Sequence, residues 1–373
     1  WVLFVAFIII APVGAATKTE EVPGLHERVD FGAAETPLPT PKRRFSTTTS
    51  VAASTFPALT LSRREREERP DRDTDPDFAL AYTEVFDPAI VPFKRMSTFD
   101  AVRDDYTLAV ADETPIDVPV GGAPSLDRDG FRATLVLDLS SGRPVAIPSV
   151  APDMRILAVE ADPPAPLAFF KDSADNFYVR AESAGTGVSR LALTLDAPAS
   201  YFAGDVPRGY RVADALPSGL LAPLPARALA AAKEVLARIG VGPALPLEKA
   251  VDRLVAYFRA FEAGPPPDDG GDVYRDLTFS QRGACRQRTF AFVVTANAAG
   301  IPARWVSNEA HAFAELWLPE IGWRRVDLGG AALELTVANT AGKAAYQPRR
   351  DDPFPRPLAY ERGYTRAAMP TDP

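Results

Sequence analysis

"SQRGACRQRTFAFVVTANAAGIPARWVSNEAHAFAELWLPEIGWRRVDLGG", residues 280–330, contains the only cysteine of the chain, Cys285. A mostly apolar helical pattern runs from Cys285 to Ala299, and Gly300 follows where a left-handed helix cap is expected. Pro302 then prevents the helix from continuing. Cys285 would therefore occupy the first helical turn, where unpaired N–H groups and the positive end of the helix dipole favour a thiolate.

Two extended segments follow the predicted helix. The stretch "AHAFAELWL", residues 310–318, alternates in the manner of a β-strand. The side chains that share one face of this strand are His311, Phe313, Glu315 and Trp317. A turn at 320–322 joins it to "WRRVDL", residues 323–328, which carries Asp327. We therefore expect His311 and Asp327 on adjacent antiparallel strands.

A helix packed on this hairpin would bring Cys285 up to His311. The imidazole would take the thiol proton, and Asp327 would hold the other ring nitrogen and stabilise its charge. A lone cysteine is more often a buried and inert apolar residue. Here the single cysteine and one of the two histidines share one short stretch with the aspartate, so a catalytic nucleophile is the favoured interpretation.

This part of the chain resembles the core of the transglutaminase-like superfamily over about residues 250–335. The motifs that carry the resemblance are "GAC" at 283–285, "GIPARWVS" at 300–307, "HAFAELWLPEIGW" at 311–323 and "VDL" at 326–328. The resemblance implies that Cys285 is the nucleophile, His311 the base and Asp327 the orienting acid. It also implies an α+β fold with a papain-like transglutaminase core, in which the nucleophile helix packs on an antiparallel sheet.

Two positions depart from the family pattern. Phe313 stands where a tryptophan is usual, and "LGG" follows Asp327 where many members have a proline. Trp305 and Phe313 are our candidates for the substrate pocket, with core packing as the alternative role for the tryptophan. We expect the backbone N–H of Cys285 to hold the oxyanion, with Gln281 as a second donor. A glutamine in a surface loop is the alternative for Gln281.

Charged residues near the proposed site have two interpretations each. Glu315 shares a face with His311 and would tune its charge. Alternatively, Glu315 forms a salt link across the hairpin with Arg324 or Arg325. The arginines that flank the nucleophile either favour the thiolate or are only solvated, and they are Arg282, Arg286 and Arg288.

Two different patterns precede this stretch. Residues 105–205 alternate with period two between Pro, Gly and Asp turns, which predicts an antiparallel β-sandwich-like domain. In "ATLVLDLSS", residues 133–141, three leucines fall on one face. Amphipathic helices are then predicted at 225–240 and at 246–262. We assign residues 220–335 to the transglutaminase-like catalytic domain.

The two ends of the chain differ in composition from its middle. Residues 1–16 are apolar and uncharged, as in the end of a transmembrane helix or the core of a signal peptide, with a buried core helix as the alternative. Residues 17–104 predict a linker rich in Pro, Ser, Thr and charge, partly ordered after residue 78, where aromatic side chains are expected along the surface of the next domain. Residues 336–373 predict a Pro- and Arg-rich tail. We expect an extracytoplasmic protein of a bacterial periplasm or cell envelope, anchored to the membrane by its first segment.

Composition narrows the function. The net charge of −8, without a basic face, argues against nucleic-acid binding. One cysteine and two histidines leave no Cys/His zinc site, and we expect neither a metal nor a cofactor. The predicted activity is attack on a glutamine or peptide amide through a thioester, followed by amine transfer, deamidation or hydrolysis. The partner would be a protein or peptide that offers Gln or Lys side chains or a peptide bond. The alternatives are a cysteine peptidase or amidase, and a non-catalytic binding module with a transglutaminase fold.

Overall fold

The computed structural model describes residues 67–72, 80–91, 93–183, 185–214, 218–268, 271–330 and 335–354. The chain divides into two compact units, Trp1–Thr55 and Phe56–Pro373, and every described residue belongs to the second. The predicted apolar segment 1–16 and most of the predicted linker lie outside the described residues. Within the described ranges, no helix combines the length and the apolar character that a membrane span requires.

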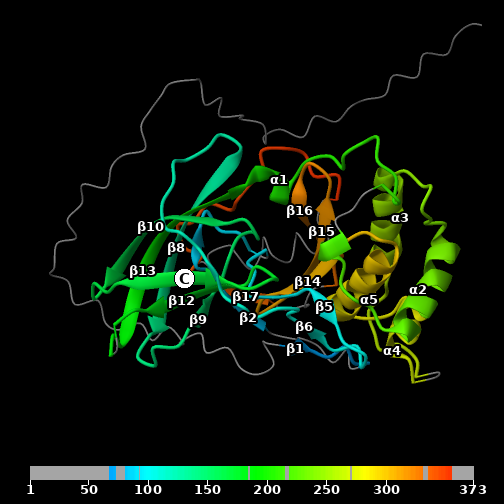
Figure 1. The fold of residues 1–373 in the computed structure, drawn as a ribbon, viewed down its shortest axis with the longest axis horizontal. Coiled ribbons are helices and arrows are strands. Elements are labelled where there is room, and N and C mark those ends of the chain that lie inside the picture. Colours follow the sequence, from blue (N-terminus) through cyan, green and yellow to red (C-terminus); the bar gives the residue numbers. More distant parts are fainter. Residues whose placement is uncertain are drawn as a thin grey trace, which may run out of the picture. The chain divides into compact units, whose positions relative to one another are not determined.

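Two antiparallel sheets form the strand-rich part of the molecule (Figure 1). The first has the strand order β10-β13-β8-β3, and its strands are β3 (Phe86–Asp87), β8 (Arg128–Asp138), β10 (Arg155–Asp162) and β13 (Val188–Pro198). The second has the order β7-β11-β12-β9, and its strands are β7 (Ile116–Asp117), β9 (Val145–Ile147), β11 (Leu167–Lys171) and β12 (Phe177–Ala181). Both sheets contribute side chains to one hydrophobic cluster, as the two layers of a sandwich do.

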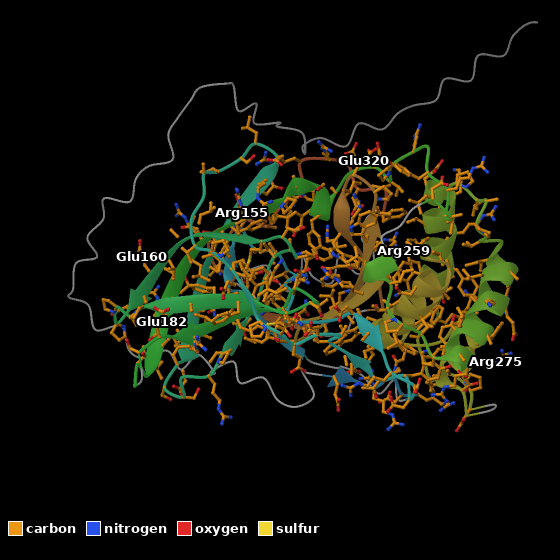
Figure 2. All side chains as sticks on the ribbon, viewed as in Figure 1. Arg155, Glu160, Glu182, Arg259, Arg275 and Glu320 are labelled. Atoms are coloured by element: carbon orange, nitrogen blue, oxygen red, sulfur yellow. The ribbon has the colours of Figure 1, made fainter. Side chains whose placement is uncertain are left out.

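The alternating sequence explains these sheets. In β8, Leu135 and Leu137 are buried while Thr134 and Asp138 are exposed. β13 pairs with β8 along its whole length and repeats the same alternation. The outer faces carry charged side chains such as Glu160 of β10 (Figure 2). The predicted period-two pattern is therefore realised as a half-buried antiparallel sheet.

Four helices and one antiparallel sheet form the other part of the molecule (Figure 1). The helices are α2 (Ala226–Ile239), α3 (Leu247–Arg259), α4 (Val273–Ser280) and α5 (Cys285–Ala298). The sheet is antiparallel with the order β16-β15-β14-β4, and its strands are β4 (Ser97–Phe99), β14 (Ala303–Ser307), β15 (Ala312–Leu318) and β16 (Gly322–Val326). Helix α5 packs directly on β14 and β15 and contacts the three other helices. This α+β arrangement confirms the predicted fold class.

Helix α4 was not anticipated from the sequence. It has only eight residues, and it begins after Asp272, whose carboxylate accepts a hydrogen bond from the N–H of Arg275 at 3.0 Å. It ends at Gln281, which adopts a left-handed conformation with φ of 51°. Because α4 ends there, the chain turns back and starts α5 four residues later, at Cys285.

Strand β4 corrects our interpretation of the stretch after residue 78. We expected its aromatic residues along the surface of the following domain, but Tyr82, Phe86 and Phe99 are buried. Phe99 pairs with Trp305 across β4 and β14, and the two rings stack with centroids 5.4 Å apart. This part of the predicted linker therefore completes the sheet that carries His311.

The remaining elements of the described residues are short. They are β1 (Glu67–Glu68), β2 (Leu80–Thr83), β5 (Ala101–Val102), β6 (Leu108–Ala109), β17 (Leu335–Ala338), helix α1 (Ala199–Phe202) and the 3-10 turn η2 (Ser218–Leu220). β17 pairs in parallel with β2, so the beginning of the predicted tail lies beside a segment of the predicted linker. The domain boundaries that we drew from the sequence stay predictions.

Candidate active site

The backbone around Cys285 is fixed by small residues and by the first turn of α5. Cys285 is the first residue of the helix and is only 3% exposed. Two residues earlier, Gly283 has a φ of 152°, and a Cβ there would lie 2.9 Å from Cβ of Gln287. The Gln287 side chain in turn accepts a hydrogen bond from the N–H of Ala284 at 2.9 Å. The "GAC" motif therefore has a local reason: only glycine fits where the chain enters the helix.

His311 is held by the turn that precedes β15. Asn308 Oδ1 accepts the N–H groups of Ala310 at 3.0 Å and of His311 at 2.9 Å. The Asn308 side chain also donates to the carbonyl of Lys94 at 2.9 Å, and the buried Lys94 ammonium forms an ion pair with Glu309. The segment before β4 thus fixes the turn from which the imidazole projects.

The structure brings the three predicted catalytic residues together. Asp327 Oδ2 lies 3.3 Å from His311 Nε2, and the Cys285 side chain is within hydrogen-bonding reach of the same ring. Asp327 Oδ1 accepts the N–H of Gly329 at 2.7 Å. Cys285, His311 and Asp327 are each 3% exposed, so the group is shielded from water.

Electrostatics favour a charged histidine in this group. Burial lowers the pKa of His311, but the charge of Asp327 and the contact with Cys285 outweigh burial and raise the pKa to about 9. Burial raises the pKa of Asp327, but the imidazolium and the Gly329 N–H outweigh it and hold the pKa below its usual value. The pair is therefore an imidazolium beside a carboxylate at neutral pH.

The two predicted oxyanion donors have other partners in this structure. The backbone N–H of Cys285 donates to the carbonyl of Gly330 at 3.1 Å. Gln281 lies at the end of α4, and its side-chain amide donates to the carbonyl of Tyr257 at 2.9 Å. The assignment of an oxyanion role to these two residues stays a prediction.

The two candidate pocket residues lie on opposite faces of the sheet. Trp305 pairs with Ala314 and belongs to the hydrophobic cluster around α5, and its indole N–H donates to the carbonyl of Arg286 at 3.4 Å. Phe313 lies on the other face, with its ring centroid 6.3 Å from that of His311. Both are buried, at 4% and 0% exposure. Their role in binding substrate stays a prediction.

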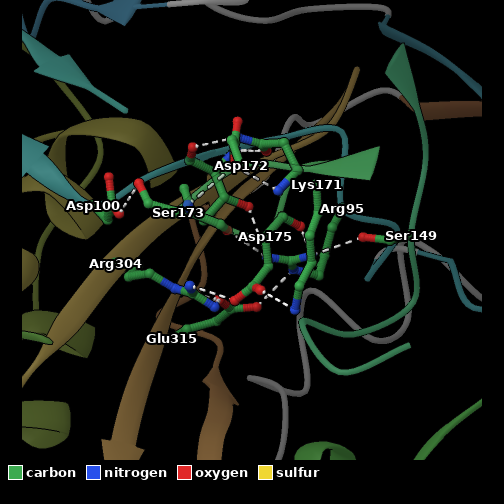
Figure 3. Close-up of polar contacts among 12 residues, drawn as sticks. Arg95, Asp100, Ser149, Lys171, Asp172, Ser173, Asp175, Arg304 and Glu315 are labelled. Atoms are coloured by element: carbon green, nitrogen blue, oxygen red, sulfur yellow. Dashed lines mark hydrogen bonds and ion pairs between the residues drawn. The ribbon is translucent and has the colours of Figure 1, made fainter. Parts of the chain in front are cut away.

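Glu315 belongs to a buried charge network that the sequence did not reveal (Figure 3). Its Oε1 accepts from Arg95 Nε at 2.7 Å and from the Tyr201 hydroxyl at 2.7 Å. Its Oε2 accepts from Arg304 Nη2 at 2.8 Å, and Arg304 Nη1 also donates to Asp175 at 2.8 Å. Arg95 and Asp175 come from outside the predicted catalytic domain, so the network joins the two parts of the molecule.

The ion pairs that Glu315 forms with Arg95 and Arg304 differ from the cross-hairpin link to Arg324 or Arg325 that we offered as one interpretation. Arg325 is opposite Glu315 in the sheet register, but its guanidinium lies over the ring of Phe93 at 3.3 Å. Arg324 forms its ion pair with Asp352 at 2.6 Å. Arg304 is directly opposite Glu315 on the other neighbouring strand, β14. Cross-strand pairing of opposite charges is therefore the sequence signal that could have predicted the Arg304–Glu315 ion pair.

Two arginines surround the aspartate end of the site. Arg259, at the end of α3 (Figure 2), donates to the carbonyl of Asp327 from Nε at 3.0 Å and from Nη2 at 2.8 Å. Arg288, one turn into α5, donates to the carbonyl of Leu328 at 3.0 Å. Sequence reasoning had noted Arg288 only for its charge and had missed Arg259. In the described part of the chain, no group of three or more His, Cys, Asp or Glu residues could hold a metal ion.

Fold and site together define a class of protein: an α+β domain in which a cysteine at the start of a helix faces a histidine and an aspartate from an antiparallel sheet. Residues 234–328 match the family model described as the transglutaminase-like superfamily. The chain thus carries a transglutaminase-like domain, which confirms the resemblance seen in its motifs. No curated protein matches the chain.

The chain aligns with a solved structure of the periplasmic domain of TgpA from Pseudomonas aeruginosa. The alignment has 20% sequence identity and a TM-score of 0.42, and it covers 73% of this chain and 94% of that chain. A structure of the same domain bound to ethylmercury aligns with 20% identity and a TM-score of 0.40, covering 65% of this chain and 87% of that chain.

Proposed function

We propose that this domain is a transglutaminase-like cysteine enzyme that acts on glutamine or peptide amides through a thioester. The observation that carries the proposal is the single cluster of Cys285, His311 and Asp327, with 3.3 Å between the imidazole and the carboxylate. Their proximity supports acyl transfer with Cys285 as the nucleophile, His311 as the base and acid, and Asp327 as the orienting group. The family match at 234–328 supports the same class of chemistry.

The reaction proceeds in two halves. The Cys285 thiolate, whose proton His311 holds, attacks the carbonyl carbon of the amide. The C–N bond breaks, and the nitrogen leaves as ammonia or an amine after taking that proton from His311. A thioester remains on Cys285. His311, now neutral, removes a proton from the second nucleophile, which attacks the thioester and releases the sulfur. Asp327 keeps the ring oriented and stabilises its positive charge in both halves.

The second nucleophile decides the product. A lysine or other primary amine gives an isopeptide bond, and water gives deamidation of a glutamine or cleavage of a peptide bond. The cluster is buried, which limits the entry of water and favours amine transfer as the first activity to test. Peptide or amide hydrolysis is the second candidate, because the same groups catalyse it when water reaches the thioester.

Mass spectrometry of glutamine-containing peptides separates these reactions. The protein is incubated with a peptide library, with and without a primary amine, and Cys285→Ala serves as the matched control. Addition of the amine with loss of ammonia shows transfer, a gain of about one dalton shows deamidation, and fragments show proteolysis. Equal product with wild type and Cys285→Ala would contradict the proposal.

We also propose an extracytoplasmic location, which the apolar composition of residues 1–16 supports. A protease added to spheroplasts, whose inner membrane is intact, should reach the catalytic domain. Protection of the domain until the spheroplasts are lysed would contradict this location.

A further inference from the structure

We propose that Arg288 is a positioning residue that holds the turn after Asp327 against the nucleophile helix and so keeps Asp327 aimed at His311. The kinetic part of this proposal rests on the proposed function. Arg288 itself touches no reacting atom in the mechanism. It acts through residues 328–330, which we call the glycine turn.

The Arg288 guanidinium lies between three segments of backbone. It is 5% exposed and starts from α5, three residues after Cys285. Its Nη1 donates to the carbonyl of Leu328 at 3.0 Å, and its Nη2 donates to the carbonyls of Phe261 at 3.0 Å and Gly283 at 3.3 Å. One side chain therefore ties the entry to the nucleophile helix to the residue that follows Asp327.

The glycine turn is fitted closely to this guanidinium. Gly330 has a φ of 81°, and a Cβ at this position would lie 2.7 Å from Arg288 Nε and 2.8 Å from Cζ. The carbonyl of Gly330 also accepts the N–H of Cys285 at 3.1 Å. The turn thus contacts α5 at both Arg288 and Cys285, and it approaches so closely because glycine has no side chain.

The same turn sets the direction of the Asp327 carboxylate. The N–H of Gly329, in the middle of the turn, donates to Asp327 Oδ1 at 2.7 Å. This bond leaves Oδ2 as the oxygen that faces His311 Nε2 at 3.3 Å. If the turn moves, the Gly329 N–H moves with it, and the carboxylate loses the contact that fixes its rotation. The path from Arg288 to His311 therefore runs through two hydrogen bonds and then the contact between the Asp327 carboxylate and the His311 ring.

Arginine is suited to this task in a way that lysine is not. The three carbonyl acceptors lie in different directions, and a planar guanidinium with five N–H donors can reach them together. A lysine ammonium would keep the positive charge but could not span the same acceptors. Arg288→Lys therefore separates a need for charge from a need for geometry.

The first test measures the histidine rather than the reaction. The chain has only two histidines, His26 and His311, so the ring resonances of His311 can be followed by NMR as the pH changes. In the wild type we expect the ring to titrate near its pKa of about 9, against 6.5 for a histidine without partners. In Arg288→Gln, we expect the midpoint to fall toward 6.5, because Asp327 is no longer held in place. An unchanged midpoint in Arg288→Gln would overturn the proposal, and it would do so whether or not an amide substrate is known.

The second test uses turnover of whichever amide substrate the library identifies. Arg288→Gln should lower kcat about 100-fold with KM nearly unchanged, as expected when a catalytic group is displaced by about 1 Å. Arg288→Lys should recover only a small part of this loss. Full recovery with lysine would show that charge, not positioning, is what matters. If no variant and no wild-type sample turns over any amide, the proposed function fails while the titration result still decides the positioning role.

A matched control separates local from general effects. Arg275→Gln removes a guanidinium from α4 whose partner is Glu234, on the surface of the helical part (Figure 2). This variant should keep the wild-type titration of His311 and the wild-type kcat. If Arg288→Gln does not fold, the smaller change Arg288→Lys is measured in its place, and a His311 midpoint equal to that of the wild type would again overturn the proposal.

Discussion

The backbone N–H of Cys285 donates a hydrogen bond to the carbonyl oxygen of Gly330 across 3.1 Å. The N–H group at the nucleophile is the donor that we expect to hold the oxyanion during amide attack. A substrate oxygen must therefore take the place of the Gly330 carbonyl before this donor can act. The glycine turn is thus part of the site, and its Gly330 carbonyl competes with the substrate oxygen for the N–H of Cys285.

Gly330→Ala should disturb the site, whereas Gly342→Ala should not. Gly330 and Gly342 have φ values of 81° and 75°, so an alanine is strained at either position, at a cost of about 1–3 kcal/mol. A Cβ at Gly342 meets nothing within 4 Å, whereas a Cβ at Gly330 collides with the Arg288 guanidinium. Both variants should lose unfolding free energy, Gly330→Ala more than Gly342→Ala, but we expect a changed iodoacetamide reaction rate of Cys285 only in Gly330→Ala. Equal rates in both variants would show that the turn does not influence the nucleophile.

Asp327→Asn should remove most of the activity while preserving the fold. The amide is nearly isosteric with the carboxylate, but it lacks the charge that stabilises the imidazolium 3.3 Å away. A loss in kcat on the order of 10⁴-fold is expected, in line with loss of the orienting acid in other triads. Steady-state kinetics check the loss, and circular dichroism checks the fold. A folded variant with kcat within about threefold of wild type would remove Asp327 from the mechanism.

The nucleophile helix and the following hairpin were predictable because their signals are local. The mostly apolar run after Cys285, the stop at Gly300 and the alternation around His311 all lie within one short stretch, and local signals of this kind predict secondary structure. The turn residues at 320–322 fixed the antiparallel hairpin, which the structure confirms through the pairing of β15 with β16. The family motifs lie on these same elements.

The remaining parts of the site depend on residues far apart in sequence. Phe99 joins the sheet beside Trp305, and Arg95 reaches Glu315, although about 200 residues separate each pair and no local pattern marks them. The Cys285–Gly330 contact depends on how the end of the sheet meets α5, which periodicity does not encode. Long-range contacts of this kind are decided by packing, so a single sequence does not reveal them.

Glu315→Gln should strongly destabilise the protein. Its carboxylate is fully buried between the Arg95 and Arg304 guanidiniums, and removal of its charge leaves two buried cations with reduced compensation. Loss of one partner from a buried ion network costs about 3–5 kcal/mol. Glu160→Gln, an exposed change on β10, is the control and should stay within about 0.5 kcal/mol of wild type. Urea unfolding of the two variants measures both values, and a loss below about 1 kcal/mol for Glu315→Gln would mean that the network contributes little.

Stability should decrease as the pH rises from 6.5 to about 9, and His311 should account for part of this decrease. The pKa of His311 is about 9 in the folded protein and 6.5 without its partners. Below pH 6.5 both states carry the proton, so the favourable contact with Asp327 contributes fully to stability. Between these values the unfolded chain releases the proton while the folded protein keeps it, so the contribution falls and is lost once the pH passes 9.

Urea unfolding of wild type and His311→Gln at pH 6, 7.5 and 9.5 measures this contribution. The difference in unfolding free energy between the two proteins should be largest at pH 6 and smallest at pH 9.5. Other groups that titrate in this range, including His26, are present in both proteins and cancel in the comparison. A difference that stays constant across the three pH values would mean that His311 has no raised pKa in the folded protein. The imidazolium–carboxylate pair would then be absent from the resting site.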